Sequence, residues 1–127
     1  MTRHTGFEIK SDRNLSEIGG RITRLIHLAT GADILAIRNH DPNKVMAITF
    51  PTLTVDSTGV AHILEHMVFR GSERYPLDQP FSALLRGSLH THLNATTQPD
   101  RTSFFVASMN KADFSNLIDV CPRIFRL

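Results

Sequence analysis

Short runs of apolar and β-branched residues, separated by turn-forming residues, constrain the fold of this chain more than any other feature. Short apolar runs between clusters of Gly, Asn, Asp and Pro are typical of β-strands. They predict strands at residues 21–29, 34–38, 44–50, 89–96 and 102–108. Because short turn clusters connect the first three, we expect those three to form a β-meander.

Further stretches show the apolar spacing of helices. They lie at residues 59–70, 79–86 and 110–121. The segment 56–59 supplies Asp, Ser and Thr as possible N-caps of the first helix, and Asn110 is the expected cap of the last. The order β-β-β-α-α-β-β-α indicates an α+β fold with a mixed or antiparallel sheet and helices packed on one face.

A chain of 127 residues is long enough for one small domain with one core. We expect residues 1–20 to form an extended lead-in with little regular structure and residues 21–121 to form the domain body. Residues 122–127 are expected to be an atypical tail, because Pro122 should break the preceding helix.

The apolar face of that last helix is predicted to contain Phe114, Leu117, Ile118 and Cys121. We interpret Cys121 as a small buried residue rather than a nucleophile. As a single cysteine it cannot form a disulfide within the chain, which favours a reducing compartment. The bacterial cytoplasm is the expected location, and an organelle matrix is the alternative.

Charge and composition argue against two classes of partner. The formal net charge is +2 and no basic run is present, so no nucleic-acid partner is expected. No apolar run approaches the length of a bilayer span, and the N-terminus lacks the apolar region of a secretory signal, so no membrane partner is expected.

The segment His62-Ile63-Leu64-Glu65-His66 carries the chemistry. Residues four apart on a helix lie on the same face, so the two imidazoles can reach one metal ion. Glu65 lies beside that face, where its carboxylate can take a proton from water. Zinc suits this arrangement because it accepts imidazole nitrogen and lowers the pKa of bound water. Ile63, Leu64, Met67 and Val68 are expected to be buried and to hold the helix in place.

Plainer interpretations exist for each of these residues. The helix can carry two surface histidines and an unrelated glutamate. His90 and His92 are two apart and would point to the same side of a strand, so they offer a second possible metal pair. We favour the interpretation that they do no chemistry.

A longer stretch around the motif resembles a known family. The run DSTGVAHILEHMVFRGSERYP, at 56–76, is similar to the signature of the pitrilysin/insulinase family of zinc peptidases. The continuation PFSALLRGSLHTHLNATTQPDRTSFFVAS, at 80–108, resembles its presequence-protease branch. The resemblance covers about residues 6–120.

The resemblance implies roles for individual residues. His62 and His66 would be zinc ligands and Glu65 the general base. Asn94 and Ala95 match a pair that holds substrate backbone at a strand edge. There an extended peptide can form main-chain hydrogen bonds with the edge and add a strand to the sheet. The alternative for Asn94 is a strand-end residue that caps a turn. The third ligand of the family is a glutamate on a later helix, expected beyond residue 127, as are further peptidase domains.

Three functions follow from these observations. The first is the N-terminal part of a zinc metalloendopeptidase that hydrolyses extended or unfolded peptides; this chain alone is then expected to be nearly inactive. The second is a truncated, non-catalytic remnant that retains a peptide- or partner-binding fold. The third is a small α+β binding domain in which the motif is accidental.

Overall fold

The computed structural model describes residues 6–68 and 80–124, with side chains described for residues 6–68 and 82–119. The chain divides into two compact units, Met1–Asp41 and Pro42–Leu127. None of the described helices combines the length and the apolar character needed to cross a membrane.

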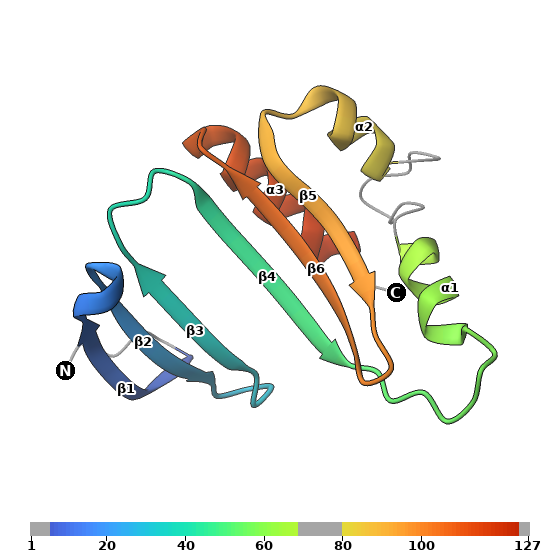
Figure 1. Ribbon diagram of the computed structural model, residues 1–127, viewed down its shortest axis with the longest axis horizontal. Coiled ribbons are helices and arrows are strands. Elements are labelled where there is room, and N and C mark those ends of the chain that lie inside the picture. Colours follow the sequence, from blue (N-terminus) through green and yellow to red (C-terminus); the bar gives the residue numbers. More distant parts are fainter. Residues whose placement is uncertain (1–5, 69–79, 125–127) are drawn as a thin grey trace. The chain divides into compact units, whose positions relative to one another are not determined.

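The first unit is an antiparallel sheet of β1 (Phe7–Leu15), β2 (Gly20–His27) and β3 (Asp33–Arg38), in that order (Figure 1). A short 3-10 helix, Ser16–Ile18, connects β1 to β2. Gly19 follows it in the left-handed region at φ 55°, a conformation that glycine adopts without a steric penalty. A three-stranded meander is therefore present, as expected. It consists of β1, β2 and β3, whereas the sequence predicted strands at residues 21–29, 34–38 and 44–50.

Strand β1 corrects the prediction that residues 1–20 lack regular structure. Its sequence is largely polar, so apolar alternation did not reveal it. The strand pairs with β2 from Phe7↔His27 to Leu15↔Gly20. The Asp12 carboxylate also accepts hydrogen bonds from the Arg21 side chain and, at 3.1 Å, from the Thr23 hydroxyl. Backbone pairing and polar cross-strand contacts thus replace an apolar pattern.

The second unit contains the other sheet, with strand order β4-β6-β5. Its strands are β4 (Lys44–Pro51), β5 (His90–Thr97) and β6 (Arg101–Ser108), all antiparallel to their neighbours. The prediction that β4 belongs to the N-terminal meander is wrong. It pairs with β6 along its whole length, from Lys44↔Ser108 to Pro51↔Arg101, without a shift in register.

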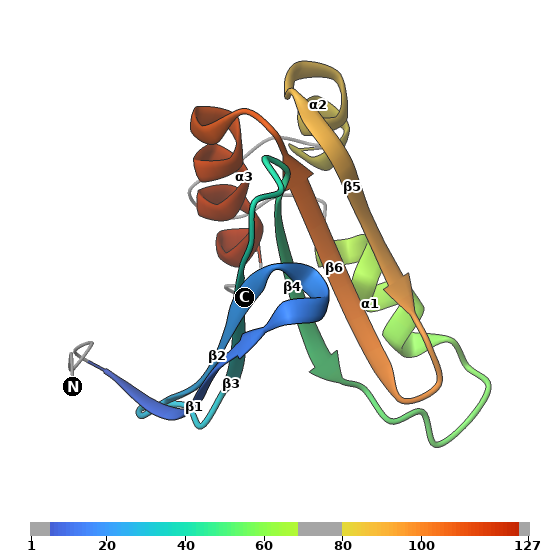
Figure 2. The same cartoon turned by 60° about the vertical axis from the view of Figure 1, so that its left-hand side comes forward.

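Helices α1 (Val60–Val68), α2 (Pro80–Gly87) and α3 (Lys111–Ile124) complete this unit (Figure 2). The core centres on Val106 of β6 and Leu117 of α3, with Met46, Leu84, Leu93 and Phe114 packed against them. Phe104, two residues before Val106, lines a pocket together with residues of α1. Side chains two apart on a strand share a face, so α1 and α3 cover the same face of the sheet, as expected.

Helix α3 confirms one prediction and corrects another. Asn110 caps it, since its side-chain oxygen accepts a hydrogen bond of 3.1 Å from the N–H of Asp113. The helix continues through Pro122 to Ile124, although Pro122 was expected to break it. A proline removes one backbone donor, but the helical turn can persist around it near a C-terminus. The Cys121 side chain lies outside the described residues.

Candidate metal and catalytic site

A tight turn sets the start of α1. The Asp56 carboxylate accepts hydrogen bonds from the N–H of Thr58, at 3.0 Å, and from its hydroxyl, at 2.5 Å. The Thr58 hydroxyl, and then its N–H, hold the pKa of Asp56 below its ordinary value. The helix begins after Gly59, which has a φ of 72°. Asp56 therefore stabilises the turn before the helix instead of capping it. The expected end of this helix, at residue 70, lies outside the described residues.

The two histidines of α1 come together as their spacing predicts. The Nε2 atoms of His62 and His66 are 3.1 Å apart, and both residues are exposed. Two nitrogens that bind one zinc ion at about 2.0–2.1 Å with near-tetrahedral angles lie about 3.3 Å apart. The pair thus fits a single zinc ion through Nε2. The donor set also suits zinc, which imidazole binds well.

Glu65 occupies a different environment from the histidines. It is only 8% exposed, and its Oε2 atom accepts a hydrogen bond of 2.5 Å from the Thr97 hydroxyl of β5. A pocket of about 290 Å³ adjoins it, lined largely by apolar side chains that include Phe50, Val68 and Phe104. Burial and one strong donor therefore hold this carboxylate in place next to the exposed imidazoles.

Fewer side chains of α1 are buried than the sequence predicted. Ile63, Leu64 and Met67 were expected to be buried, but they are 60%, 46% and 56% exposed. Of the predicted anchors only Val68 is buried, together with Glu65. A nine-residue helix on a three-stranded sheet buries one stripe, and positions 65 and 68 occupy it.

A third metal ligand is not found in the described part of the chain. Within residues 6–68 and 82–119, no three His, Cys, Asp or Glu side chains lie close enough together to hold an ion. As zinc ligands, His62 and His66 would supply two of the three protein ligands that catalytic zinc sites use.

Asn94 and Ala95 lie on β5, which is an edge strand of its sheet. Asn94 pairs with Phe105 and Ala95 with Phe104, so the two side chains point to opposite faces. The Asn94 side-chain oxygen accepts a hydrogen bond of 2.9 Å from the N–H of Ala95. Helix α1, which carries the two histidines, contacts β5.

His90 and His92 do not form a pair. The sequence predicted that they point to the same side of a strand, but a bulge between them shifts the register. His90 pairs with Ser108 and its Nδ1 is 2.9 Å from the Ser88 hydroxyl oxygen. His92 pairs with Ala107 and packs its ring against Phe105 at 6.4 Å. The extra residue at the bulge places the two imidazoles on opposite faces.

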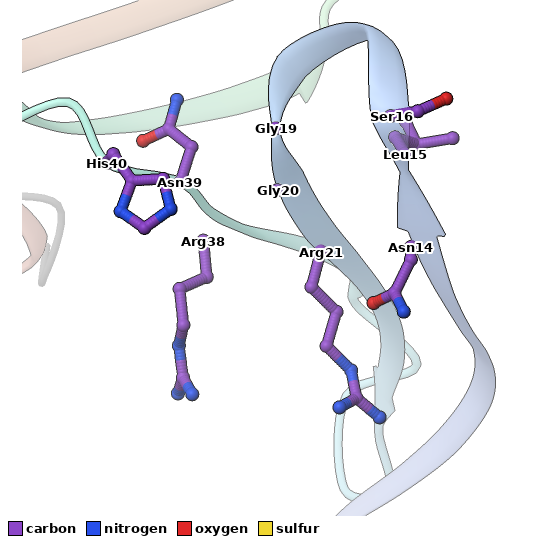
Figure 3. Close-up of a pocket in the computed structure, with 9 residues that line it drawn as sticks. All are labelled: Asn14, Leu15, Ser16, Gly19, Gly20, Arg21, Arg38, Asn39 and His40. Carbon is purple, nitrogen blue, oxygen red and sulfur yellow. The ribbon is translucent and has the colours of Figure 1, made fainter.

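The first unit has an open pocket of about 680 Å³ that the sequence did not predict. Figure 3 shows Arg21 and Arg38 extending in the same direction beside it. They are register partners on β2 and β3, and Asp12 forms an ion pair with Arg21. Gly20 is required here, because a Cβ atom would lie 2.5 Å from the Arg38 carbonyl oxygen. No residue of this pocket belongs to the histidine site.

Comparison with known proteins decides the family. The family model described as Insulinase (Peptidase family M16) matches residues 54–126, which include α1 and its histidines. The chain belongs to peptidase family M16. This membership confirms the resemblance, and the antiparallel sheets with helices on one face confirm the expected α+β fold.

Two curated relatives match nearly the whole chain. "Presequence protease 1, chloroplastic/mitochondrial" of Arabidopsis thaliana is 50% identical over 115 residues, or 91% of this chain and 11% of its own length. "Protein HypA" of Clostridium perfringens is 49% identical over 117 residues, or 92% of this chain and 12% of its own length. The chain thus spans about a tenth of the curated relatives that it matches.

A solved structure of pitrilysin shares the M16 fold of this chain. The alignment has a TM-score of 0.78 at 21% sequence identity and covers 94% of this chain and 13% of that one. At this identity the likeness establishes the fold, not the roles of individual residues.

The residue that sequence reasoning missed is Thr97. The predicted strand stopped at residue 96, one short of it. The half-buried positions of β5 include Leu93, Ala95 and Thr97. Extending this alternation by one residue identifies Thr97 as facing the covered side, although nothing in the sequence points to its contact with Glu65.

Proposed function

We propose that this chain supplies part of the active site of a zinc metalloendopeptidase that hydrolyses extended or unfolded peptides. M16 membership supports a peptidase. The observation that carries the proposal is the 3.1 Å separation of the His62 and His66 Nε2 atoms beside the buried carboxylate of Glu65. Zinc, when bound, lowers the pKa of water towards neutrality and polarises the peptide carbonyl.

Each residue then has one task. His62 and His66 hold the ion through Nε2. Glu65 takes a proton from the attacking water at a carboxylate oxygen and later passes it to the leaving amine. The edge of β5 that faces away from β6 binds the substrate backbone as an added strand, with Asn94 and Ala95 beside the scissile bond. Because Asn94 already occupies the N–H of Ala95, a bound peptide has to replace that hydrogen bond.

A complete site needs a third protein ligand, which we propose is a glutamate outside the described residues. The partners of this chain are then peptide substrates and the remaining peptidase segments that the longer relatives contain. With two imidazoles, the 127-residue chain alone binds zinc weakly and does not turn over peptide. With a single cysteine, the chain suits a reducing compartment, either the bacterial cytoplasm or an organelle matrix.

The second candidate is a non-catalytic remnant that keeps a peptide- or partner-binding fold. It is favoured by the edge position of β5 among the described strands, together with a metal site of only two ligands among the described residues. Such a remnant binds an extended peptide at this edge without needing zinc.

One experiment separates the two. The 127-residue chain is compared with a completed enzyme, in which the chain replaces the matching 115 residues of the Arabidopsis presequence protease. Zinc affinity is measured by competition with a chelator, and cleavage is measured on an unstructured peptide. We expect tight zinc and chelator-sensitive turnover only in the completed enzyme. A completed enzyme that folds but neither binds zinc nor cleaves peptide supports the remnant instead.

A further inference from the structure

Thr97, the last residue of β5, contacts the predicted catalytic carboxylate. We propose that Thr97 is a positioning residue for Glu65: its hydroxyl holds Oε2 in a fixed orientation, so that Oε1 is the atom that takes up the proton. The inference rests on the proposed role of Glu65 and adds a residue from a different element of the fold.

The Thr97 hydroxyl donates a hydrogen bond to a buried carboxylate. The Thr97 Oγ1 and Glu65 Oε2 atoms are 2.5 Å apart, and Glu65 is 8% exposed. Hydrogen bonds from a hydroxyl to an ionised carboxylate are shorter and stronger than those between neutral groups. A buried carboxylate also requires a partner, because leaving it unsatisfied is costly.

The surrounding sheet directs the Thr97 hydroxyl. Thr97 pairs with Thr102 on the covered face, and the Thr102 hydroxyl oxygen is 2.8 Å from that of Thr52 on the other side. The Thr102 hydroxyl is therefore hydrogen-bonded to Thr52, on the side of the sheet where β4 lies. Thr97 is also β-branched, so its side chain has few χ1 rotamers and loses little freedom on forming the bond.

The orientation of the carboxylate matters for rate more than for binding. Glu65 is placed on α1 while Thr97 is placed on β5, so the bond ties the helix to the strand that is proposed to hold the substrate. Without it the carboxylate can rotate away from the attacking water. Small displacements of a catalytic group cost a large factor in rate. Substrate contacts to the β5 edge remain unchanged.

Variants of the completed enzyme test this role. Thr97→Val keeps the shape and removes the donor, while Thr97→Ser keeps the donor. We expect Thr97→Val to lower kcat by about tenfold or more, with KM and bound zinc unchanged. Thr97→Ser should recover most of that loss. Thr96→Val is the matched control, because the exposed Thr96 pairs with Ser103 on the opposite face.

A second measurement uses the 127-residue chain itself. The ¹³C resonance of the Glu65 carboxyl, assigned by its loss in Glu65→Gln, should shift in Thr97→Val but not in Thr97→Ser or Thr96→Val. An unshifted resonance, or a Thr97→Val enzyme with unchanged kcat beside an inactive Glu65→Gln enzyme, overturns the role of Thr97 and leaves Glu65 as the base. Normal cleavage by Glu65→Gln overturns both the proposed function and this inference.

Discussion

The two sheets of this chain are similar in size but stabilised differently. In the first unit none of the described residues 6–41 is buried, and side chains such as Leu28 and Leu35 are 63% and 59% exposed. In the second, β6 is buried from Thr102 to Ser108 apart from Phe105. The residues that we propose to be catalytic lie in the second unit. Burial against this packed sheet helps to hold the Glu65 carboxylate in one orientation.

The largest expected effect concerns the metal pair of the second unit. In the completed enzyme, His62→Ala or His66→Ala should each abolish stoichiometric zinc and peptide cleavage, because two remaining protein ligands hold zinc poorly. Elemental analysis after dialysis measures the loss. His90→Ala and His92→Ala are the controls, since the bulge directs them away from each other. Loss of zinc in either control would show that the ligand set is wrong.

The next effect compares the packing of the two units. Leu117 is fully buried, so Leu117→Ala should destabilise the 127-residue chain by about 2–5 kcal/mol in denaturant unfolding. Leu35→Ala, at an exposed site of the first sheet, should change stability by about 0.5 kcal/mol or less. Equal effects at the two sites would mean that the first sheet is packed as tightly as the second.

A smaller effect is expected at the edge of the second sheet. Asn94→Ala should lower kcat/KM of the completed enzyme by roughly tenfold, the scale of one lost hydrogen bond to substrate. The melting temperature should stay near that of the parent, because β5 keeps its pairing with β6. If stability falls and the kinetics do not change, Asn94 serves only to cap its own strand.

The smallest effect belongs to the polar contacts of the first sheet. The hydrogen bond from Arg21, followed by that from Thr23, holds the pKa of Asp12 below its ordinary value of 3.8. A depressed carboxyl pKa contributes stability above the unfolded value that is lost as the pH falls through the folded value. Asp12→Asn should therefore be slightly less stable than the parent at pH 7, and the difference should shrink as the pH falls below 3.8 and through the lowered folded pKa. A difference that persists in acid would assign the effect to something other than this ion pair.

The sequence predicted those parts of the molecule whose signal is local. The spacing of His62 and His66 on one helix fixed their proximity, and Asn110 marked the start of α3. Strand β1 was missed because Asp12, Arg13 and Asn14 give it no apolar alternation, so that cross-strand pairing alone reveals it.

Long-range pairing accounts for the other differences. The partner of β4 is β6, whose paired residues lie 50 to 64 positions later, and no local pattern distinguishes it from β3. The bulge before His92 inserts one residue, which moves the His92 side chain to the other face of the sheet. The strict alternation of faces along a strand cannot reveal such an insertion. The hydrogen bond between Thr97 and Glu65 depends on where α1 lies over the sheet, so it follows from the fold and not from either segment.

Replacement of Glu65 by glutamine tests the central claim most directly. Gln keeps the size of the side chain and can still pair with Thr97, but it cannot accept the proton. We expect the Glu65→Gln form of the completed enzyme to keep one zinc per molecule and the parent melting temperature while kcat falls by at least about a hundredfold. Cleavage of an unstructured peptide at near-parent rate by this zinc-loaded variant would contradict the assignment of Glu65 as the general base.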